Sequence, residues 1–110
     1  IYKKLTHSPR KHKVLISQES FMDWYNSQPK ICSYCGITEE QIKFQNDAYL
    51  KKCNRLTIDR MDSSKPYVEE NLTLACLRCN HIKGDFFTAS EMEQIGKIFI
   101  SKKWNYGNKI

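Results

Sequence analysis

The sequence of 110 residues predicts a small α+β domain in which two short strands lie between flanking helices and two cysteine pairs. Three observations predict this class. Residues 56–58 and 72–75 are short alternating segments with β-branched residues, which is typical of strands. The segments around them carry helix caps and apolar residues at helical spacing. Four of the five cysteines form two Cys-x-x-Cys pairs, one before and one after the strands.

A basic arm and a helix are predicted to open the chain. Residues 1–16 are rich in lysine and arginine and contain a proline, which favours an irregular or extended arm. Ser17 is a suitable N-cap, and aromatic residues recur at helical spacing behind it, so we expect a helix over residues 17–27. Further on, Thr38 and Gln41 have the spacing of a capping box, which predicts a second, short helix.

The predicted strands and two more helices complete the domain. Residues 56–58 and 72–75 are joined by a polar loop, and the simplest connection makes the strands antiparallel. The second cysteine pair begins a helix that ends near Gly84. Ser90 and Glu93 have capping-box spacing, which predicts a last helix. Large aromatic side chains are expected in the core, namely those of Phe21, Trp24, Phe86, Phe87 and Trp104.

Length and charge limit the organisation and the partners. A chain of this length forms one ordinary domain, and we expect an arm over residues 1–16, one domain over residues 17–104 and a tail over residues 105–110. The 18 lysines and arginines exceed the 12 acidic residues by six, which favours a polyanionic partner such as nucleic acid. No apolar run approaches the roughly 18 residues of a membrane helix. We therefore expect a cytoplasmic protein, nucleoid-associated or phage-encoded.

The spacing of Cys32, Cys35, Cys76 and Cys79 predicts a structural zinc site. Two thiolates of one pair can reach the same tetrahedral ion, and two pairs complete a closed four-thiolate site. A thioredoxin-like redox motif or two disulfides are the alternatives, but neither explains why the pattern occurs twice. Such a zinc contributes an apparent ~10–16 kcal/mol in small peptides, so we expect the metal-free protein to be unfolded or molten.

Three polar residues near the strands are hard to explain by packing. Asp59 stands at the end of the first strand, Asn71 opens the second, and Asn80 directly follows the second cysteine pair. If the strands pair and the helix packs across them, Asp59 and Asn80 face each other. Carboxylate and amide oxygens suit Mg²⁺, which keeps its waters for substrate phosphates. Taken singly, each of these residues also fits a turn or a helix surface.

Residues 32–88 together resemble the HNH, or ββα-metal, nuclease family, and the resemblance covers about half of the chain. Any one of its elements is weak, but their order is specific. The elements are the two cysteine pairs, Ile58-Asp59-Arg60 in the place of the family's Asp-His, Asn71, and Cys79-Asn80-x-x-Lys83 in the place of its final Cys-His/Asn-x-x-Lys. The resemblance implies a zinc-stapled, treble-clef-like core with flanking helices.

The resemblance also implies an activity and a set of site residues. It implies a DNA endonuclease that hydrolyses phosphodiester bonds by attack of water, activated by one Mg²⁺ or Mn²⁺ ion. Asp59 and Asn80 would hold this ion, while Asn71 would brace the hairpin loop by hydrogen bonds to the backbone. Lys83 or Arg78 would then contact phosphate.

Arg60 departs from the family pattern, because the family has its general base, a histidine, at this position. An arginine stays protonated and cannot take a proton from water, although it can bind a phosphate oxygen or stabilise the transition state. The attacking water then needs another activator, which is the metal, Asp62, His81 or a group of the substrate. His81 follows Asn80 on a helix and points about 100° away from it. We favour a metal-activated water with Arg60 on the phosphate.

Other functions remain compatible with these residues. The main alternative is a zinc-knuckle module that binds nucleic acid and has lost catalysis, which the arginine at position 60 would explain. A zinc-binding protein-interaction domain is a third possibility. The arm residues Arg10, Lys11 and Lys13 are expected to contact the DNA backbone, and RNA is not excluded. The sequence does not decide between a monomer and a homodimer, or whether the chain is one domain of a larger restriction, defence or mobile-element protein.

Overall fold

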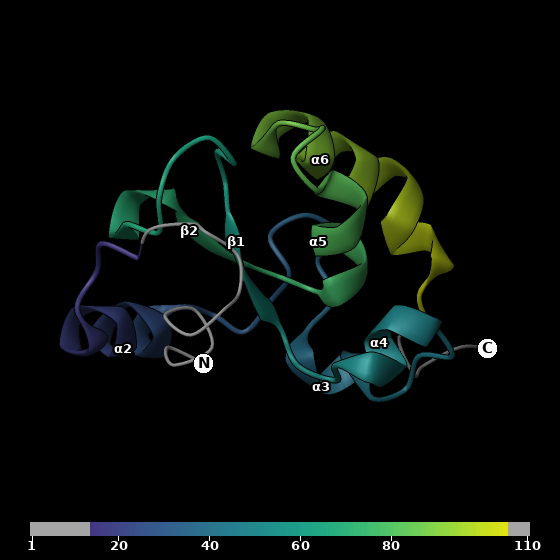
Figure 1. Cartoon of the computed structure of the whole chain (residues 1–110). Coiled ribbons are helices and arrows are strands. Elements are labelled where there is room, and N and C mark those ends of the chain that lie inside the picture. Colours follow the sequence, from purple (N-terminus) through teal and green to yellow (C-terminus); the bar gives the residue numbers. More distant parts are fainter. Residues whose placement is uncertain (1–13, 106–110) are drawn as a thin grey trace.

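The two predicted strands pair as an antiparallel hairpin near the middle of the structure (Figure 1). The computed structural model describes residues 14–105, in which β1 spans Thr57–Arg60 and β2 spans Leu72–Ala75. Asp59 pairs with Thr73 across the hairpin. The predicted antiparallel pairing is therefore confirmed, but Asp59 lies inside β1 rather than at its end.

Helices lie on both sides of this hairpin, which confirms the α+β class. Figure 1 shows α2 to the left of the hairpin, α5 and α6 to the right, and α3 and α4 below. The helices in chain order are α2 (Gln18–Ser27), α3 (Glu39–Ile42), α4 (Ala48–Lys52), α5 (Leu77–Lys83) and α6 (Ala89–Ile95). Shorter helical turns are η1 (Glu69–Asn71), the π-helical η2 (Gly96–Ile100) and η3 (Ser101–Lys103). Within the described residues, none of the helices has the length and apolar character needed to cross a membrane.

Two helices begin at the caps that the sequence predicts. The side chain of Ser17 accepts a hydrogen bond from the first turn of α2. Thr38 and Gln41 make both hydrogen bonds of a capping box at the start of α3. Each cap pairs a backbone N–H group that has no partner within the helix, and so fixes where the helix begins.

Two other helices differ from the prediction. The capping box of α6 is formed by Thr88 and Glu91, so the helix begins two residues earlier than Ser90 and Glu93 predict. Both pairs have the same spacing, and the sequence pattern cannot choose between them. Helix α4 was not predicted at all. It is a short helix capped by Asp47, whose carboxylate accepts two backbone N–H bonds.

The core lies between the hairpin and the helices, and it includes all four cysteines of the two pairs. Phe21, Trp24 and Trp104 are buried in it, as predicted, and Phe87 is partly buried. Phe86 was wrongly predicted to be a core residue, because its side chain is 83% exposed. It stands on the turn after α5, where Phe87 packs on the core and the Phe86 ring meets the Phe87 ring edge to face.

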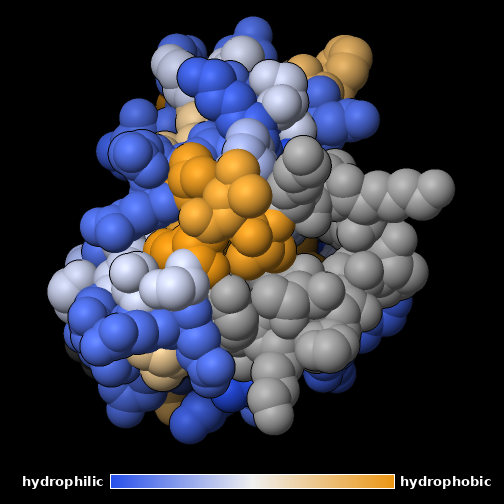
Figure 2. All heavy atoms as spheres, turned by 60° about the vertical axis from the view of Figure 1, so that its left-hand side comes forward, coloured by the Kyte–Doolittle hydropathy of each residue, from blue (hydrophilic) through white to orange (hydrophobic). Residues whose placement is uncertain are grey.

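The face seen in Figure 2 is largely hydrophilic, with one apolar area near its middle. Over all faces of the described part of the chain, the large apolar side chains that stay exposed are Leu15, Met22, Ile31, Phe44, Phe86, Ile98 and Phe99. The arm residues predicted to contact nucleic acid, which are Arg10, Lys11 and Lys13, lie outside the described residues.

Candidate metal centres and the polar site between β1 and α5

Four cysteine side chains from two distant segments converge in the core. The Sγ atoms of Cys32, Cys35, Cys76 and Cys79 all lie within 4.8 Å of one another, and all four residues are buried. None of them forms a disulfide. A tetrahedral zinc with Zn–S bonds of about 2.3 Å requires sulfur atoms about 3.8 Å apart. The Sγ atoms of Cys35 and Cys76 are 3.8 Å apart, so the cluster fits a zinc ion.

The surroundings of the cluster also suit a bound divalent ion. The indole Nε1 of Trp104 donates a hydrogen bond to Cys35 Sγ at 3.1 Å. Four thiolates within 4.8 Å of one another repel, so the four groups cannot all be ionised without a cation between them. A zinc ion stabilises all four thiolates and leaves no position for water, which makes this centre structural.

The zinc cluster joins a tight turn to the start of α5. The turn, called here the knuckle (residues 32–36), ends at Gly36, whose φ of +84° favours glycine. Cys76 is the N-cap of α5, and its sulfur accepts a bond from the backbone N–H of Cys79 at 3.5 Å. The two pairs therefore set the position of α5 against the hairpin.

Helix α5 crosses β1 with two polar pairs side by side. Alternate residues of a strand share a face, so Thr57 and Asp59 point to the same side of β1. Residues three apart share a face of a helix, and Asn80 and Lys83 meet those two residues. Asn80 Nδ2 donates to Thr57 Oγ1 at 2.9 Å, and Lys83 Nζ lies 3.4 Å from Asp59 Oδ2. Asn80 and Asp59 thus lie on facing surfaces of α5 and β1, but in neighbouring pairs. Asn80 contacts Thr57, and Asp59 contacts Lys83.

The Asp59 carboxylate is buried and held through one of its oxygens. The residue is 6% exposed, and the hydroxyl of Tyr34 donates to its Oδ2 at 2.6 Å. Burial raises the pKa of Asp59, while the Tyr34 hydroxyl and the Lys83 ammonium act in the opposite direction. Burial and the nearby carboxylate together raise the pKa of Tyr34, which therefore stays a proton donor.

Lys83 and Arg78 already have protein partners. The Lys83 side chain is fully buried, and its ammonium donates to the backbone oxygen of Arg60 at 2.9 Å. In this structure it supports Asp59 and the end of β1 and does not face solvent, where a phosphate would be. Arg78 donates to Asp47 Oδ1 at 2.6 Å and lies 4.2 Å over the ring of Tyr49.

Arg60 and Asn71 hold the loop between the strands. Arg60 follows Asp59 in β1 and therefore points to the opposite face. Its Nη1 donates to the backbone oxygens of Ser63 and Lys65 at 2.5 and 2.8 Å. Asn71 is buried, and its Nδ2 donates to the backbone oxygen of Asp62 at 3.0 Å while its Oδ1 accepts from the Asp62 N–H at 2.8 Å.

His81 and Asp62, the two side chains considered as activators of water, are placed away from the Asn80–Thr57 contact. His81 Nε2 lies 2.8 Å from the hydroxyl of Tyr49 on α4, and the two rings stack. Asp62 lies in the loop after β1, where its carboxylate accepts two bonds from Ser64. These bonds lower the pKa of Asp62.

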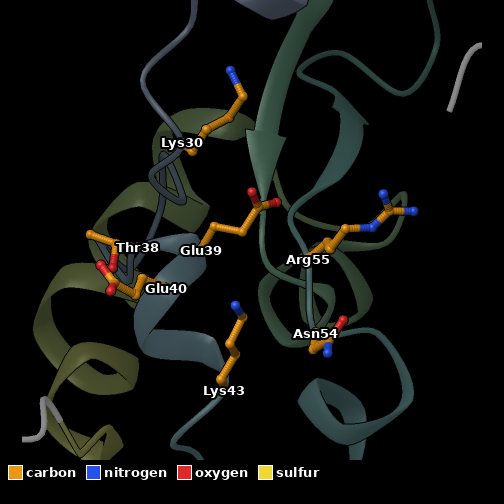
Figure 3. Close-up of a pocket in the computed structure, with 7 residues that line it drawn as sticks. All are labelled: Lys30, Thr38, Glu39, Glu40, Lys43, Asn54 and Arg55. Atoms are coloured by element: carbon orange, nitrogen blue, oxygen red, sulfur yellow. The ribbon is translucent and has the colours of Figure 1, made fainter.

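Sequence reasoning missed Tyr34 and Thr57, which complete the polar site. The sequence does carry a signal for Thr57, because this residue precedes Asp59 by two positions in a predicted strand and so shares its face. The signal for Tyr34 is weaker. It is only that the residue stands inside a cysteine pair, and its partner Asp59 is distant in sequence. A polar hollow of about 680 Å³ elsewhere contains none of the predicted site residues (Figure 3), and its lining is Lys30, Thr38, Glu39, Glu40, Lys43, Asn54 and Arg55.

Comparison with known proteins identifies the family. The chain is similar to the solved structure of the rare-cutting HNH restriction endonuclease PacI, at 32% sequence identity and a TM-score of 0.77. The similarity covers 94% of this chain and 75% of that one. No family model and no curated protein matches the sequence. The similarity over nearly the whole chain, together with the four-cysteine cluster, shows that the chain belongs to the HNH endonuclease family and is a nuclease.

Proposed function

We propose that the protein is a DNA endonuclease that hydrolyses phosphodiester bonds with one Mg²⁺ or Mn²⁺ ion held by Asp59 and Asn80. The observation that carries this proposal is the crossing of α5 over β1, which sets the Asn80 side chain against the face of β1 that bears Asp59. DNA is the proposed substrate because the similar structure is that of a restriction endonuclease described by its perturbation of DNA.

The donor atoms of the two side chains suit such an ion. Asp59 uses Oδ2 for its bonds to Tyr34 and Lys83, and Asn80 uses Nδ2 for its bond to Thr57. Each side chain has one further oxygen, and these are the hard ligands that Mg²⁺ prefers. A divalent ion bound there would activate a water molecule and offset the charge of the phosphate.

The other residues of the site have supporting roles in this proposal. Tyr34 and Lys83 orient the Asp59 carboxylate, and Asn71 holds the loop after β1. Arg60 stays protonated, but it points to the face of β1 opposite Asp59 and donates to backbone oxygens of the loop; a contact with a phosphate oxygen at the end of the strand would require these bonds to be exchanged. Because a positioned general base usually contributes about 10²–10⁴ in rate, we expect a slow nuclease.

Nicking of a supercoiled plasmid tests this function. The wild-type chain, loaded with zinc, should convert the plasmid to the open circle only when Mg²⁺ or Mn²⁺ is added. Asp59→Ala and Asn80→Ala should each abolish nicking, whereas Asn54→Ala changes an exposed asparagine of the polar hollow and should leave it unchanged. Nicking that survives both site substitutions would reject the assigned residues.

A catalytically degenerate nucleic-acid-binding module is the second candidate. Two observations favour it, which are the arginine at position 60 and the buried Lys83 ammonium that already offsets the charge of Asp59. This candidate predicts salt-dependent DNA binding and no cleavage with any divalent ion. Arg60→His separates the two candidates, because a gain of cleavage would reveal a metal site that lacks only a base.

A further inference from the structure

Tyr34 connects the zinc cluster directly to the proposed catalytic carboxylate. It lies between Cys32 and Cys35 in the knuckle, and its side chain is only 2% exposed. Its hydroxyl donates to Asp59 Oδ2 at 2.6 Å. A hydrogen bond to an ionised acceptor is shorter and about twice as strong as a neutral one, and this distance is in that short range. The knuckle therefore carries two zinc ligands and the donor that holds Asp59.

The hairpin fixes one side of the knuckle. The backbone N–H of Ser33 donates to the Leu74 oxygen at 2.9 Å, and the Ser33 hydroxyl donates to the same oxygen at 2.6 Å. The Ser33 hydroxyl also lies 2.5 Å from Thr73 Oγ1. Thr73 is the residue opposite Asp59 in the hairpin. The knuckle is thus fixed at the same level of the sheet as the carboxylate it contacts.

The C-terminal helical region fixes the other side of the knuckle. Gly96 packs so closely that a Cβ atom there would lie 2.3 Å from the backbone oxygen of Tyr34. Trp104 donates to the sulfur of Cys35. Because the backbone of Tyr34 is held between β2 and η2, its ring has little freedom to withdraw from Asp59.

We propose that Tyr34 is a positioning residue that sets Asp59 for the divalent ion, so that the zinc cluster controls the catalytic metal site through it. The inference rests on the proposed function, which places the ion at Asp59. By holding Oδ2, the hydroxyl stops the carboxylate from rotating and keeps its other oxygen for the ion. Loss of a hydrogen-bond partner of a ligating carboxylate typically weakens metal binding by about 10–100-fold.

The test is Tyr34→Phe, which removes the hydroxyl and keeps the buried ring. Binding of Mn²⁺ to the zinc-loaded chain is titrated by the electron paramagnetic resonance signal of the free ion, and zinc content is measured on the same samples. We expect Mn²⁺ affinity to fall by about 10–100-fold with zinc content unchanged. Tyr25→Phe is the matched control, since Tyr25 stacks on Phe21 in α2, and it should keep the wild-type affinity.

Asp59→Asn separates the inference from the proposed function. If Asp59→Asn weakens Mn²⁺ binding and Tyr34→Phe does not, the role of Tyr34 is overturned while the metal site stands. If Asp59→Asn itself leaves Mn²⁺ affinity unchanged, the ion is not at Asp59, and both the proposed function and this inference fail. A Tyr34→Phe chain that unfolds at lower temperature with the wild-type Mn²⁺ affinity would mean that Tyr34 has a structural role only, which also overturns the inference.

Discussion

A single methyl group at Gly96 should separate the knuckle from the C-terminal helical region. In Gly96→Ala, the new Cβ would lie 2.3 Å from the oxygen and 2.4 Å from the carbonyl carbon of Tyr34, and 2.9 Å from the nitrogen of Cys35. Ordinary van der Waals contact begins at 3.4 Å. One of the two backbone segments must therefore move by about 1 Å, since no flexible side chain is available to absorb the clash.

The free energy that Gly96→Ala costs can be converted into an expected fall in the melting temperature. Overpacking a well-packed site costs about 1–3 kcal/mol, and a clash between two backbones belongs at the upper end, about 3 kcal/mol. For a domain of about this size, each kcal/mol lowers the melting temperature by about 4–8 °C. Gly96→Ala should therefore lower the melting temperature by about 12–24 °C, and zinc should be lost to a chelator faster than from the wild type.

Gly36→Ala is the matched control, measured by thermal unfolding of the zinc-loaded chain under the same conditions. Gly36 has a φ of +84° and nothing within 4 Å of its Cβ position. Its substitution thus costs only the strain of the left-handed conformation, about 1–2 kcal/mol. A Gly96→Ala chain that melts at or above the temperature of Gly36→Ala would refute the close contact between η2 and the knuckle.

The remaining predictions concern zinc, a buried ion pair and acid stability. Removal of zinc by a strong chelator should abolish the near-UV and much of the far-UV circular dichroism, because the zinc contributes about as much free energy as the whole domain has; an unchanged spectrum would contradict this. Lys83→Met leaves Asp59 buried without its cation, which should lower the free energy of unfolding by about 3–5 kcal/mol. A Mn²⁺ ion at Asp59 would replace the lost positive charge, so Mn²⁺ should raise the melting temperature of Lys83→Met more than that of the wild type. An equal rise in the two chains would count against an ion at Asp59. Burial alone would raise the pKa of Asp47, but hydrogen bonds from Arg78 and the backbone together lower it by more, so the net shift of the pKa is downward. The stability that this carboxylate contributes is therefore present above about pH 4 and is lost as the pH falls through the lowered pKa. Asp47→Asn should lower the melting temperature at pH 7, and its melting temperature should fall less steeply on acidification than that of the wild type. Equally steep falls in the two chains would refute this contribution of Asp47 to stability.

The sequence was enough to predict the parts of the fold that depend on local chemistry. The two cysteine pairs predicted the cluster because thiolates at that spacing reach one ion. Ser17 and the pair Thr38 and Gln41 predicted helix starts because they are the side chains that cap free backbone N–H groups. Where two overlapping pairs had the same spacing, as at the start of α6, the local pattern could not decide. Helix α4 was missed because five residues are too few to show a helical period.

The polar site could be predicted only in outline, because its details depend on tertiary contacts. The expectation that α5 packs across β1 holds, but the register of the helix on the strand places Asn80 over Thr57 and Lys83 over Asp59. Lysine is almost never fully buried unless it is paired, so the burial of Lys83 follows only once Asp59 is known to face it. Tyr34 was missed for the same reason, since nothing local to the knuckle indicates its distant acceptor.

The central claim is that Asp59 and Asn80 share a divalent ion, and a crystal of the zinc-loaded protein soaked with Mn²⁺ tests it most directly. Anomalous diffraction near the manganese edge locates the ion independently of any activity. We predict a peak between β1 and α5 within coordination distance of an oxygen of Asp59 and of Asn80, separate from the zinc at the four cysteines. Manganese found only elsewhere, with no anomalous peak between Asp59 and Asn80, would contradict the account.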